Sequence, residues 1–416
     1  MNILRIIGSM DPASGGPCQG IRNSCNELQK MGVHNEVVCL NRPDADFLGK
    51  DSFPIHAVGP GKGPWNYAPK LIPWLSENIG RFDAVIVHGL WLYPSYAAIK
   101  ALKRFKARQS GPTKGAGKVP RLFIMPHGML DPYFQKAEGR KLKALRNWLY
   151  WKVIEGDVVK QADGVLFTCQ AELELARTTF SPYRPSQEIN VGYGIVTPPA
   201  FHLEMRKTFL DKCPGLGEQP YWLFLSRIHQ KKGVDLLVEA YRNILLKQQE
   251  LGGEIPKLVI AGPKLETAYG QKIQQMVDDD PLLKKNVFLP GMLAGNAKWG
   301  AFYGCEAFTL PSHQENFGIS VVEALACGKS VLISNQVNIW REIEAARCGI
   351  VTPDTLEGTQ QALTTWLRLS TAEKEKMNQR ARAAFEREFA IPAAAQRLWE
   401  VVKPASNSMV DEKVSV

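Results

Sequence analysis

The strongest constraint on the fold is an alternation of strand-like and helix-like segments that runs through the chain twice. In the first round the strand-like runs are NILRIIG, NEVVCLN, DAVIVHG, RLFIMPHG and GVLFTC. Each is short and apolar and ends in turn or polar residues, and segments with helical periodicity lie between them. Strands that alternate with helices are typical of a parallel, doubly wound α/β sheet.

The same pattern restarts with YWLFLSR and continues through KLVIAG, NVFLPG, AFTLPS and SVLISN. A chain of 416 residues is long for one domain and comfortable for two. Two adjacent prolines in residues 196–205 interrupt the pattern. We therefore expect two tandem Rossmann-like domains, residues 1–200 and 201–392.

Cysteine usage and hydropathy limit the classes of protein that fit. The eight cysteines are scattered, no CxxC pair occurs, and the histidine spacing suggests no zinc site. The amino-terminal segment lacks the pattern of a secretory signal, and no stretch approaches the roughly 18 apolar residues of a membrane span. These features predict a cytoplasmic protein with reduced thiols.

Most of the net positive charge lies in the first domain. Residues 1–200 hold 25 of the 51 basic residues but 16 of the 41 acidic ones, and no acid occurs between Asp83 and Asp131. Residues 136–152 (KAEGRKLKALRNWLYWK) interleave bases with aromatic residues. This pattern fits an anionic membrane surface, nucleic acid, or a solvated helix face with its aromatics in the core. We favour the membrane surface and expect no nucleic-acid partner.

Two carboxylates stand out in residues 311–328, PSHQENFGISVVEALACG. This segment joins two predicted strands, so it is expected to cross over through a helix that starts near Phe317–Gly318. A helix amino terminus at a strand end suits phosphates or sugar hydroxyls. Glu315 precedes that helix, and Glu323 lies on it among apolar neighbours, where a carboxylate needs a partner such as vicinal hydroxyls. The alternative is a solvated helix face.

A second candidate is the loop SRIHQKKGVD, residues 226–235, which follows a strand of the second domain. Arg227 and Lys232 are two cations in a loop that opens a helix, an arrangement that suits an anion clamp. The alternative is a charged turn. Both loops should open at the same edge of the sheet.

Other features are weaker alone. The glycine-rich segment 8–20 could approach a pyrophosphate, but it is neither a P-loop nor a GxGxxG motif. His127 and His88 each end a strand and could equally be packed side chains. The sequence DAD at residues 44–46 lacks a supporting pattern, so no metal site is predicted.

The chain resembles the retaining glycosyltransferases of family 4 in four features, which occur in the order expected for that family. They are the glycine-rich loop, the HG at His127, the R-x4-K-G at Arg227 and the E-x7-E at Glu315. The resemblance covers nearly the whole chain. It implies a GT-B fold, with two Rossmann-like domains that face a cleft and a last helix, about residues 393–410, that returns to the first domain. It also implies a nucleotide-sugar donor on the second domain and no cofactor or essential metal.

The resemblance implies a role for each matching residue in the second domain. Arg227 and Lys232 would hold the donor diphosphate, and Glu323 would bind the ribose hydroxyls. Glu315 would bind a hydroxyl of the transferred sugar. The adjoining backbone and the segment near the base would complete the donor site, through Phe317, Gly318, Ile319, Met292 and Leu293.

In the first domain, the resemblance implies that Gly15 and Gly16 approach the diphosphate and that His127 touches the donor sugar. Two positions depart from the family pattern. Pro263 stands where the family often has a glycine, and Tyr193–Gly194 stands for the usual Asn-Gly. Both leave the diphosphate clamp intact.

Retention of configuration requires either double displacement or front-face attack. Glu315 is the one candidate nucleophile, and the resemblance assigns it to binding, so front-face attack is expected. We predict transfer of a hexose from a UDP-sugar, with UDP-glucose the best guess, to a lipid-linked glycan at the inner face of the cell membrane, as in exopolysaccharide assembly. The alternatives are a nucleotide-sugar epimerase of the same fold and a non-catalytic binding module.

Overall fold

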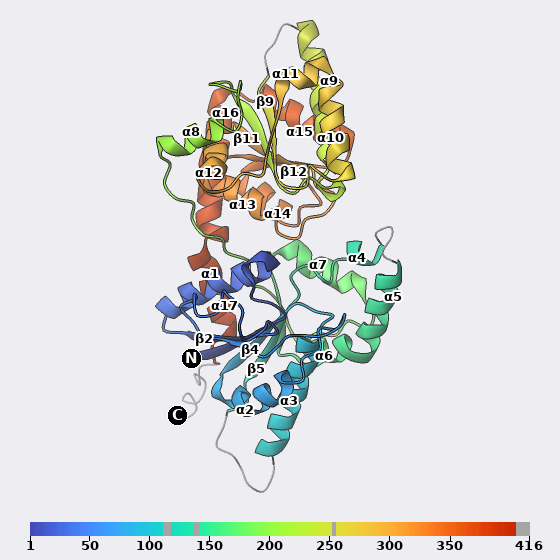
Figure 1. Cartoon of the computed structure of the whole chain (residues 1–416), viewed down its shortest axis with the longest axis vertical. Coiled ribbons are helices and arrows are strands. Elements are labelled where there is room, and N and C mark those ends of the chain that lie inside the picture. Colours follow the sequence, from blue (N-terminus) through green and yellow to red (C-terminus); the bar gives the residue numbers. More distant parts are fainter. Residues whose placement is uncertain (111–117, 137–140, 252–254, 405–416) are drawn as a thin grey trace, which may run out of the picture. The chain divides into compact units, whose positions relative to one another are not determined.

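The computed structural model describes residues 1–110, 118–136, 141–251 and 255–404. The chain forms two compact units. Unit 1 consists of Met1–Thr168, Leu173–Gly194 and the segment from Ala394, and unit 2 consists of Cys169–Glu172 and Ile195–Ala393. Figure 1 shows a sheet flanked by helices in each unit.

Unit 1 contains a seven-stranded parallel sheet in the order β3-β2-β1-β4-β5-β6-β7. Its strands are β1 Asn2–Ile7, β2 His34–Cys39, β3 Ile55–Ala57, β4 Ala84–His88, β5 Arg121–Met125, β6 Gly164–Phe167 and β7 Glu188–Asn190. Helices cover both faces of this sheet, so its central strands are buried: β4 is buried over its whole length and β1 from Ile3 to Ile7.

The helices of the first half are α1 Gly16–Lys30, α2 Leu71–Asn78, α3 Tyr93–Gln109, α4 Tyr133–Lys136, α5 Lys141–Tyr150, α6 Gly156–Gln161 and α7 Gln170–Thr179. A π-helical turn, Trp151–Glu155, joins α5 to α6. Strand order reverses at β1 and β4, so the loops that follow these two strands diverge there. Ligands of open α/β sheets bind at such a point.

Unit 2 contains a six-stranded parallel sheet in the order β10-β9-β8-β11-β12-β13. Its strands are β8 Tyr221–Leu225, β9 Lys257–Ala261, β10 Val287–Gly291, β11 Ala307–Leu310, β12 Val331–Ser334 and β13 Gly349–Thr352. Its helices are α8 Leu203–Leu210, α9 Val234–Leu251, α10 Ala268–Asp278, α11 Pro281–Asn286, α12 Gly295–Gly304, α13 Ile319–Ala326, α14 Trp340–Ala346, α15 Leu356–Arg368 and α16 Thr371–Ala384. Here the reversal falls between β8 and β11, the strands that precede the two loops singled out from the sequence.

The predicted fold class, two Rossmann-like α/β domains, is confirmed. Toward the carboxyl end, α16 runs into a π-helical turn, Phe385–Phe389, and the backbone is extended at Ala390. The last helix, α17, spans Ile391–Val402. It contributes Leu398 to a core cluster of unit 1. Residues 405–410 of the predicted last helix lie outside the described residues. Among the helices that are described, none has the length and apolar character needed to span a bilayer.

Candidate functional site

The loop after β8 presents one exposed cation and one buried cation. Arg227 is exposed, whereas Lys232 is 4% exposed. Gly233 adopts a left-handed conformation (φ 63°), and a Cβ there would lie 2.2 Å from the carbonyl oxygen of Pro311. Glycine at this position therefore lets the loop pack closely against the segment that follows β11.

The loops after β8 and β11 are joined by hydrogen bonds. The buried hydroxyl of Ser312 donates to the carbonyl of Lys231 at 2.9 Å, and the backbone N–H of His313 donates to the same carbonyl at 2.9 Å. Lys232 Nζ forms an ion pair with the Glu315 carboxylate. Two charged residues separated by more than 80 positions in the chain thus meet at the switch point of the sheet.

The backbone around Glu315 is held on both sides. Its N–H donates to the carbonyl of Gln336 at 2.9 Å, and its carbonyl accepts from the N–H of Asn338 at 2.9 Å. Gly318, in a left-handed conformation (φ 76°), caps α13, which begins at Ile319 close to the predicted start. Phe317 is buried and Ile319 is exposed. The free N–H groups of the first turn of α13 therefore lie next to Glu315.

Glu323 lies in the second turn of α13, and its side chain is 14% exposed. Its Oε1 accepts from Lys298 Nζ at 2.6 Å. Burial raises the pKa of Glu323, and the charge and hydrogen bond of Lys298 oppose that shift. Lys298 is a residue that the sequence analysis missed. It is the one charged residue of α12, and an isolated charge in an otherwise uncharged helix could have drawn attention to it.

The loops after β9 and β10 border the same region of unit 2. Gly262 donates to the carbonyl of Gly291 at 2.8 Å, and a Cβ on Gly262 would lie 1.7 Å from the carbonyl oxygen of Ser226. The carbonyl of Pro263 accepts from the N–H of Ile228 at 2.9 Å. Proline at this departure from the family pattern thus still braces the loop of Arg227. Of the two residues predicted near the base, Met292 is exposed and Leu293 is buried.

In unit 1, the glycine-rich loop after β1 leads into α1. Gly15 has a φ of 92°, a conformation that favours glycine, and it precedes the first residue of the helix, Gly16. The Tyr193 hydroxyl donates to the carbonyl of Gly16 at 2.7 Å. A Cβ on Gly20 would lie 2.5 Å from the Tyr193 ring. The second departure, Tyr193, therefore packs on the start of α1.

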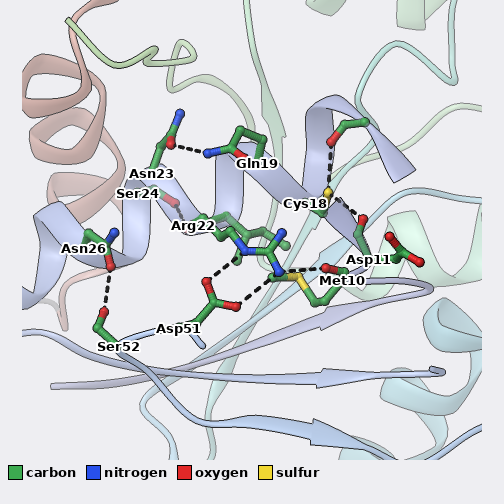
Figure 2. A network of polar contacts seen from close by, with 12 residues as sticks. Met10, Asp11, Cys18, Gln19, Arg22, Asn23, Ser24, Asn26, Asp51 and Ser52 are labelled. Atoms are coloured by element: carbon green, nitrogen blue, oxygen red, sulfur yellow. Dashed lines mark hydrogen bonds and ion pairs between the residues drawn. The ribbon is translucent and has the colours of Figure 1, made fainter. Parts of the chain in front are cut away.

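A network drawn in Figure 2 ties this loop to α1. Arg22, on α1, donates from Nη2 to the carbonyl of Met10 at 2.8 Å and from Nε to Asp51 Oδ1 at 2.8 Å. The Cys18 thiol donates to the carbonyl of Gly15 at 3.0 Å. The glycine-rich loop is thus anchored at both ends.

Two histidines near the carboxyl ends of strands of unit 1 are in contact: His88 is the last residue of β4, and His127 lies just beyond the end of β5 at Met125. His88 Nδ1 lies 2.9 Å from His127 Nε2. His127 has a left-handed backbone (φ 54°), as does Gly128 after it. Burial, with a smaller contribution from the charge of Arg5, lowers the pKa of His127 to about 4. The sequence placed both residues at strand ends but did not predict their contact.

The described residues contain no group of three His, Cys, Asp or Glu side chains placed to hold a metal ion. Asp44, from the discounted DAD sequence, pairs with Arg42 at 2.8 Å in an exposed loop. All eight cysteines are buried, and none forms a disulfide.

Comparison with known proteins places the chain among glycosyltransferases. Residues 15–190 match the family model described as "Glycosyl transferase 4-like domain", and residues 207–384 match "Glycosyl transferases group 1". A D-inositol 3-phosphate glycosyltransferase from Paenarthrobacter aurescens is 29% identical over 162 residues, which cover 38% of this chain and 38% of that protein. The chain thus spans well under two thirds of the length of this curated relative.

Solved structures match over nearly the whole chain. Anabaena HepE in complex with UDP and glucose aligns with a TM-score of 0.69 at 18% identity and covers 97% of this chain and 99% of that one. Sucrose-phosphate synthase from Thermosynechococcus elongatus aligns with a TM-score of 0.68 at 17% identity and covers 96% and 98%. At sequence identities of 17% and 18%, these structural alignments establish the fold of the chain.

Together the fold and the two domain matches define a protein of the GT-B class. Its particular architecture is a glycosyl transferase 4-like domain followed by a glycosyl transferases group 1 domain.

Proposed function

We propose that the protein is a retaining glycosyltransferase that moves a hexose from a UDP-sugar, with UDP-glucose the best guess, to a sugar hydroxyl of a lipid-linked glycan. The observation that carries this proposal is the cluster of Lys232, Glu315 and the α13 amino terminus, with Glu323 held nearby by Lys298. Cations beside free helix N–H groups suit a diphosphate, and carboxylates suit the hydroxyls on either side of it. The bound UDP and glucose of Anabaena HepE favour a uridine donor.

The proposed reaction needs no metal and no protein nucleophile. The bond between the anomeric carbon and the diphosphate oxygen breaks, and Arg227 and Lys232 stabilise the charge that develops on the leaving diphosphate. The acceptor hydroxyl attacks the same face of the sugar, and its proton passes to the departing phosphate oxygen. Lys232 has three N–H donors, so it can contact phosphate while it still holds Glu315.

A donor panel of UDP-, GDP- and ADP-sugars, assayed by thermal shift and by hydrolysis, tests the donor. We expect UDP-sugars to give the largest shift. Arg227→Ala and Lys232→Ala should lower turnover by about 100-fold or more, as expected when a stabiliser of transition-state charge is removed. Lys284→Ala, in α11, is the control. Turnover within a few-fold of wild type in both clamp variants would contradict the assignment.

Product analysis of the same donor panel, with and without acceptors, separates the alternatives. An epimerase would convert the UDP-sugar into a different UDP-sugar without any acceptor. A non-catalytic module would bind the donor with a measurable affinity but would transfer nothing across a panel of acceptors. If a slow fluorinated donor traps a glycosyl–Glu315 adduct, the mechanism is double displacement and not front-face attack.

We further propose that unit 1 rests on the inner face of the cell membrane through α5. Leu142, which is 85% exposed, and Leu145 and Leu149, which are also exposed, recur three and four residues apart and so lie on one face of the helix. Exposed bases flank this stripe at Lys141, Lys143, Arg146 and Lys152. Of the aromatics in the basic run, Trp151 is buried and Trp148 is exposed.

An exposed leucine stripe between bases suits an interfacial helix on anionic lipid. Flotation with vesicles that contain anionic lipid tests this. Because inserting one leucine contributes about 1.5–3 kcal/mol, Leu145→Glu should weaken binding by about tenfold or more. Leu203→Glu, at an exposed leucine of unit 2, is the matched control. Binding that is equal on neutral vesicles and insensitive to salt would contradict the electrostatic part of the proposal.

A further inference from the structure

A buried chain of three side chains in unit 1 connects Arg5 to His127. Arg5 lies on β1 and is 1% exposed, and its Nη1 lies 3.4 Å from His88 Nε2. His88, the last residue of β4, lies 2.9 Å from His127 Nε2 through its Nδ1. The guanidinium is also held by Asn35 Oδ1 at 3.3 Å and by the Ser24 hydroxyl at 3.4 Å.

Arg5 carries a buried charge that forms no ion pair with a carboxylate in the described residues. Such a charge is costly to bury, so its position calls for a reason other than stability. Burial lowers the pKa of Arg5, and the neighbouring Cys25 partly opposes the shift. An arginine side chain nonetheless stays protonated in proteins.

Because a guanidinium can only donate hydrogen bonds, it sets the direction of the whole chain. His88 Nε2 must accept from Arg5, so neutral His88 carries its proton on Nδ1. That N–H then donates to His127 Nε2, so neutral His127 carries its own proton on Nδ1. The tautomers of both histidines thus follow from Arg5, which can only donate hydrogen bonds.

The titratable groups that face His127 are His88 and, beyond it, Arg5. Both oppose a positive charge on the ring. Burial is the largest cause that lowers the pKa of His88 well below its ordinary value, followed by the charges of His127 and Arg5. With the pKa of His127 at about 4, both rings are neutral near pH 7.

We propose that Arg5 and His88 are positioning residues that hold His127 as a neutral hydrogen-bond donor protonated on Nδ1. This inference rests on the proposed function and on the role that the family resemblance implies for His127, which is contact with the donor sugar. The Nε2 lone pair is occupied by His88, and Nδ1 already carries a proton. The ring can therefore donate one hydrogen bond to a hydroxyl or phosphate oxygen of the donor, and it does not accept the proton of the acceptor hydroxyl. That proton is left to the departing phosphate.

Nitrogen NMR on the full-length protein, with ¹⁵N-labelled histidine, tests the tautomer directly. The His127 signals are identified by their loss in His127→Gln. Between pH 6 and pH 8 we expect a protonated Nδ1 and an unprotonated Nε2 at His127, with no titration of the ring. A wild-type spectrum with the proton on Nε2, or a ring that titrates near its ordinary pKa, would overturn the proposal.

Paired variants test the two positioning residues. Arg5→Lys keeps a group that can only donate and should preserve the tautomer, whereas Arg5→Met should let the His127 signals shift toward a mixture of both tautomers. His88→Asn can still offer an N–H to His127 Nε2, whereas His88→Leu cannot and should shift the signals in the same way. An unchanged His127 tautomer in both Arg5→Met and His88→Leu would show that Arg5 and His88 do not position His127. This measurement needs no sugar donor. A failure of the proposed sugar transfer would therefore not be confused with a failure of Arg5 and His88 to set the tautomer of His127.

Discussion

At the scale of single residues, sequence motifs identified both members of the Lys232–Glu315 pair in the candidate site but only one member of the Lys298–Glu323 pair. Glu323 belongs to a recognisable spacing and lies among apolar neighbours, which predicts a buried carboxylate with a partner. Its partner within the chain, Lys298, lies 25 positions away on α12 and matches no motif. Arg5 was equally hidden, because a strand arginine can be recognised as buried only when the sheet around it is known.

Replacement of Lys298 by methionine should weaken donor binding in a pH-dependent way. Burial already raises the pKa of Glu323, and loss of the Lys298 charge removes the effect that opposes this shift. Glu323 would then become protonated at a higher pH and lose its charge-assisted hydrogen bonds to the ribose. The donor KM should rise about tenfold and rise further as the pH falls, with kcat less affected. Lys298→Arg is the control, and a KM that does not depend on pH in the methionine variant would contradict the expectation.

Glu155 should make unit 1 less stable as the pH rises. Its side chain is fully buried, Oε1 accepts from the Trp91 N–H at 2.8 Å and from the Ser95 hydroxyl at 2.6 Å, and burial raises its pKa to about 7. The folded state therefore holds a proton that the unfolded state releases near pH 4.5. The resulting stability is full below that pH and is lost as the pH rises to about 7.

Denaturation of Glu155→Gln in urea at pH 5 and pH 8 checks this prediction. From pH 5 to pH 8, the free energy of unfolding of wild type should fall by on the order of 3 kcal/mol more than that of the variant, because glutamine does not ionise. Glu77→Gln, at an exposed position, should show no such change. Parallel pH profiles for wild type and Glu155→Gln would refute the account.

At the scale of elements, strands and long helices were predictable because their apolar spacing is regular. The start of α13 was predicted because Gly318 separates a polar loop from an apolar helical segment. The π-helical turn at Trp151–Glu155 was not predicted, since local spacing does not mark it; in the structure both of its end residues are buried. For the loops after β8 and β11, the sequence predicted only that they open at the same edge of the sheet. It did not predict which residues of the two loops are in contact.

Gly233→Ala should damage the donor loop beyond the ordinary cost of its backbone conformation. A left-handed conformation costs a residue with a side chain roughly 1–2 kcal/mol, and the new Cβ would also lie 2.2 Å from the carbonyl oxygen of Pro311. The loop must therefore move and displace Lys232 from Glu315. Gly217→Ala is a matched control, because Gly217 also has a positive φ (57°) but nothing lies within 4 Å of its Cβ position. We expect a higher donor KM in Gly233→Ala alone. Equal effects of the two substitutions on stability and KM would argue against the packing explanation.

At the scale of the whole molecule, the two α/β units were predictable from the repeated alternation, because each round carries enough apolar strands for its own core. The return of the last helix was different. It was expected only from the family resemblance, since the amphipathic pattern of α17 shows that it packs on something but not on which unit. The helix shares its core cluster with residues such as Ile3 and Leu28, which lie at the other end of the sequence.

Because α17 completes a core cluster of unit 1, Leu398→Ala should destabilise that unit selectively. Loss of a buried leucine side chain costs about 2–5 kcal/mol. The backbone contacts of the helix, such as Arg121 Nη1 donating to the carbonyl of Val401 at 2.9 Å, do not replace the lost packing. Hydrogen exchange should show reduced protection in β1, β4 and β5 and unchanged protection in β8 through β13. Gln396→Ala, at an exposed position of the same helix, should leave both sets of strands protected. An equal loss of protection in both units would mean that they unfold together and that the contribution of α17 is not confined to unit 1.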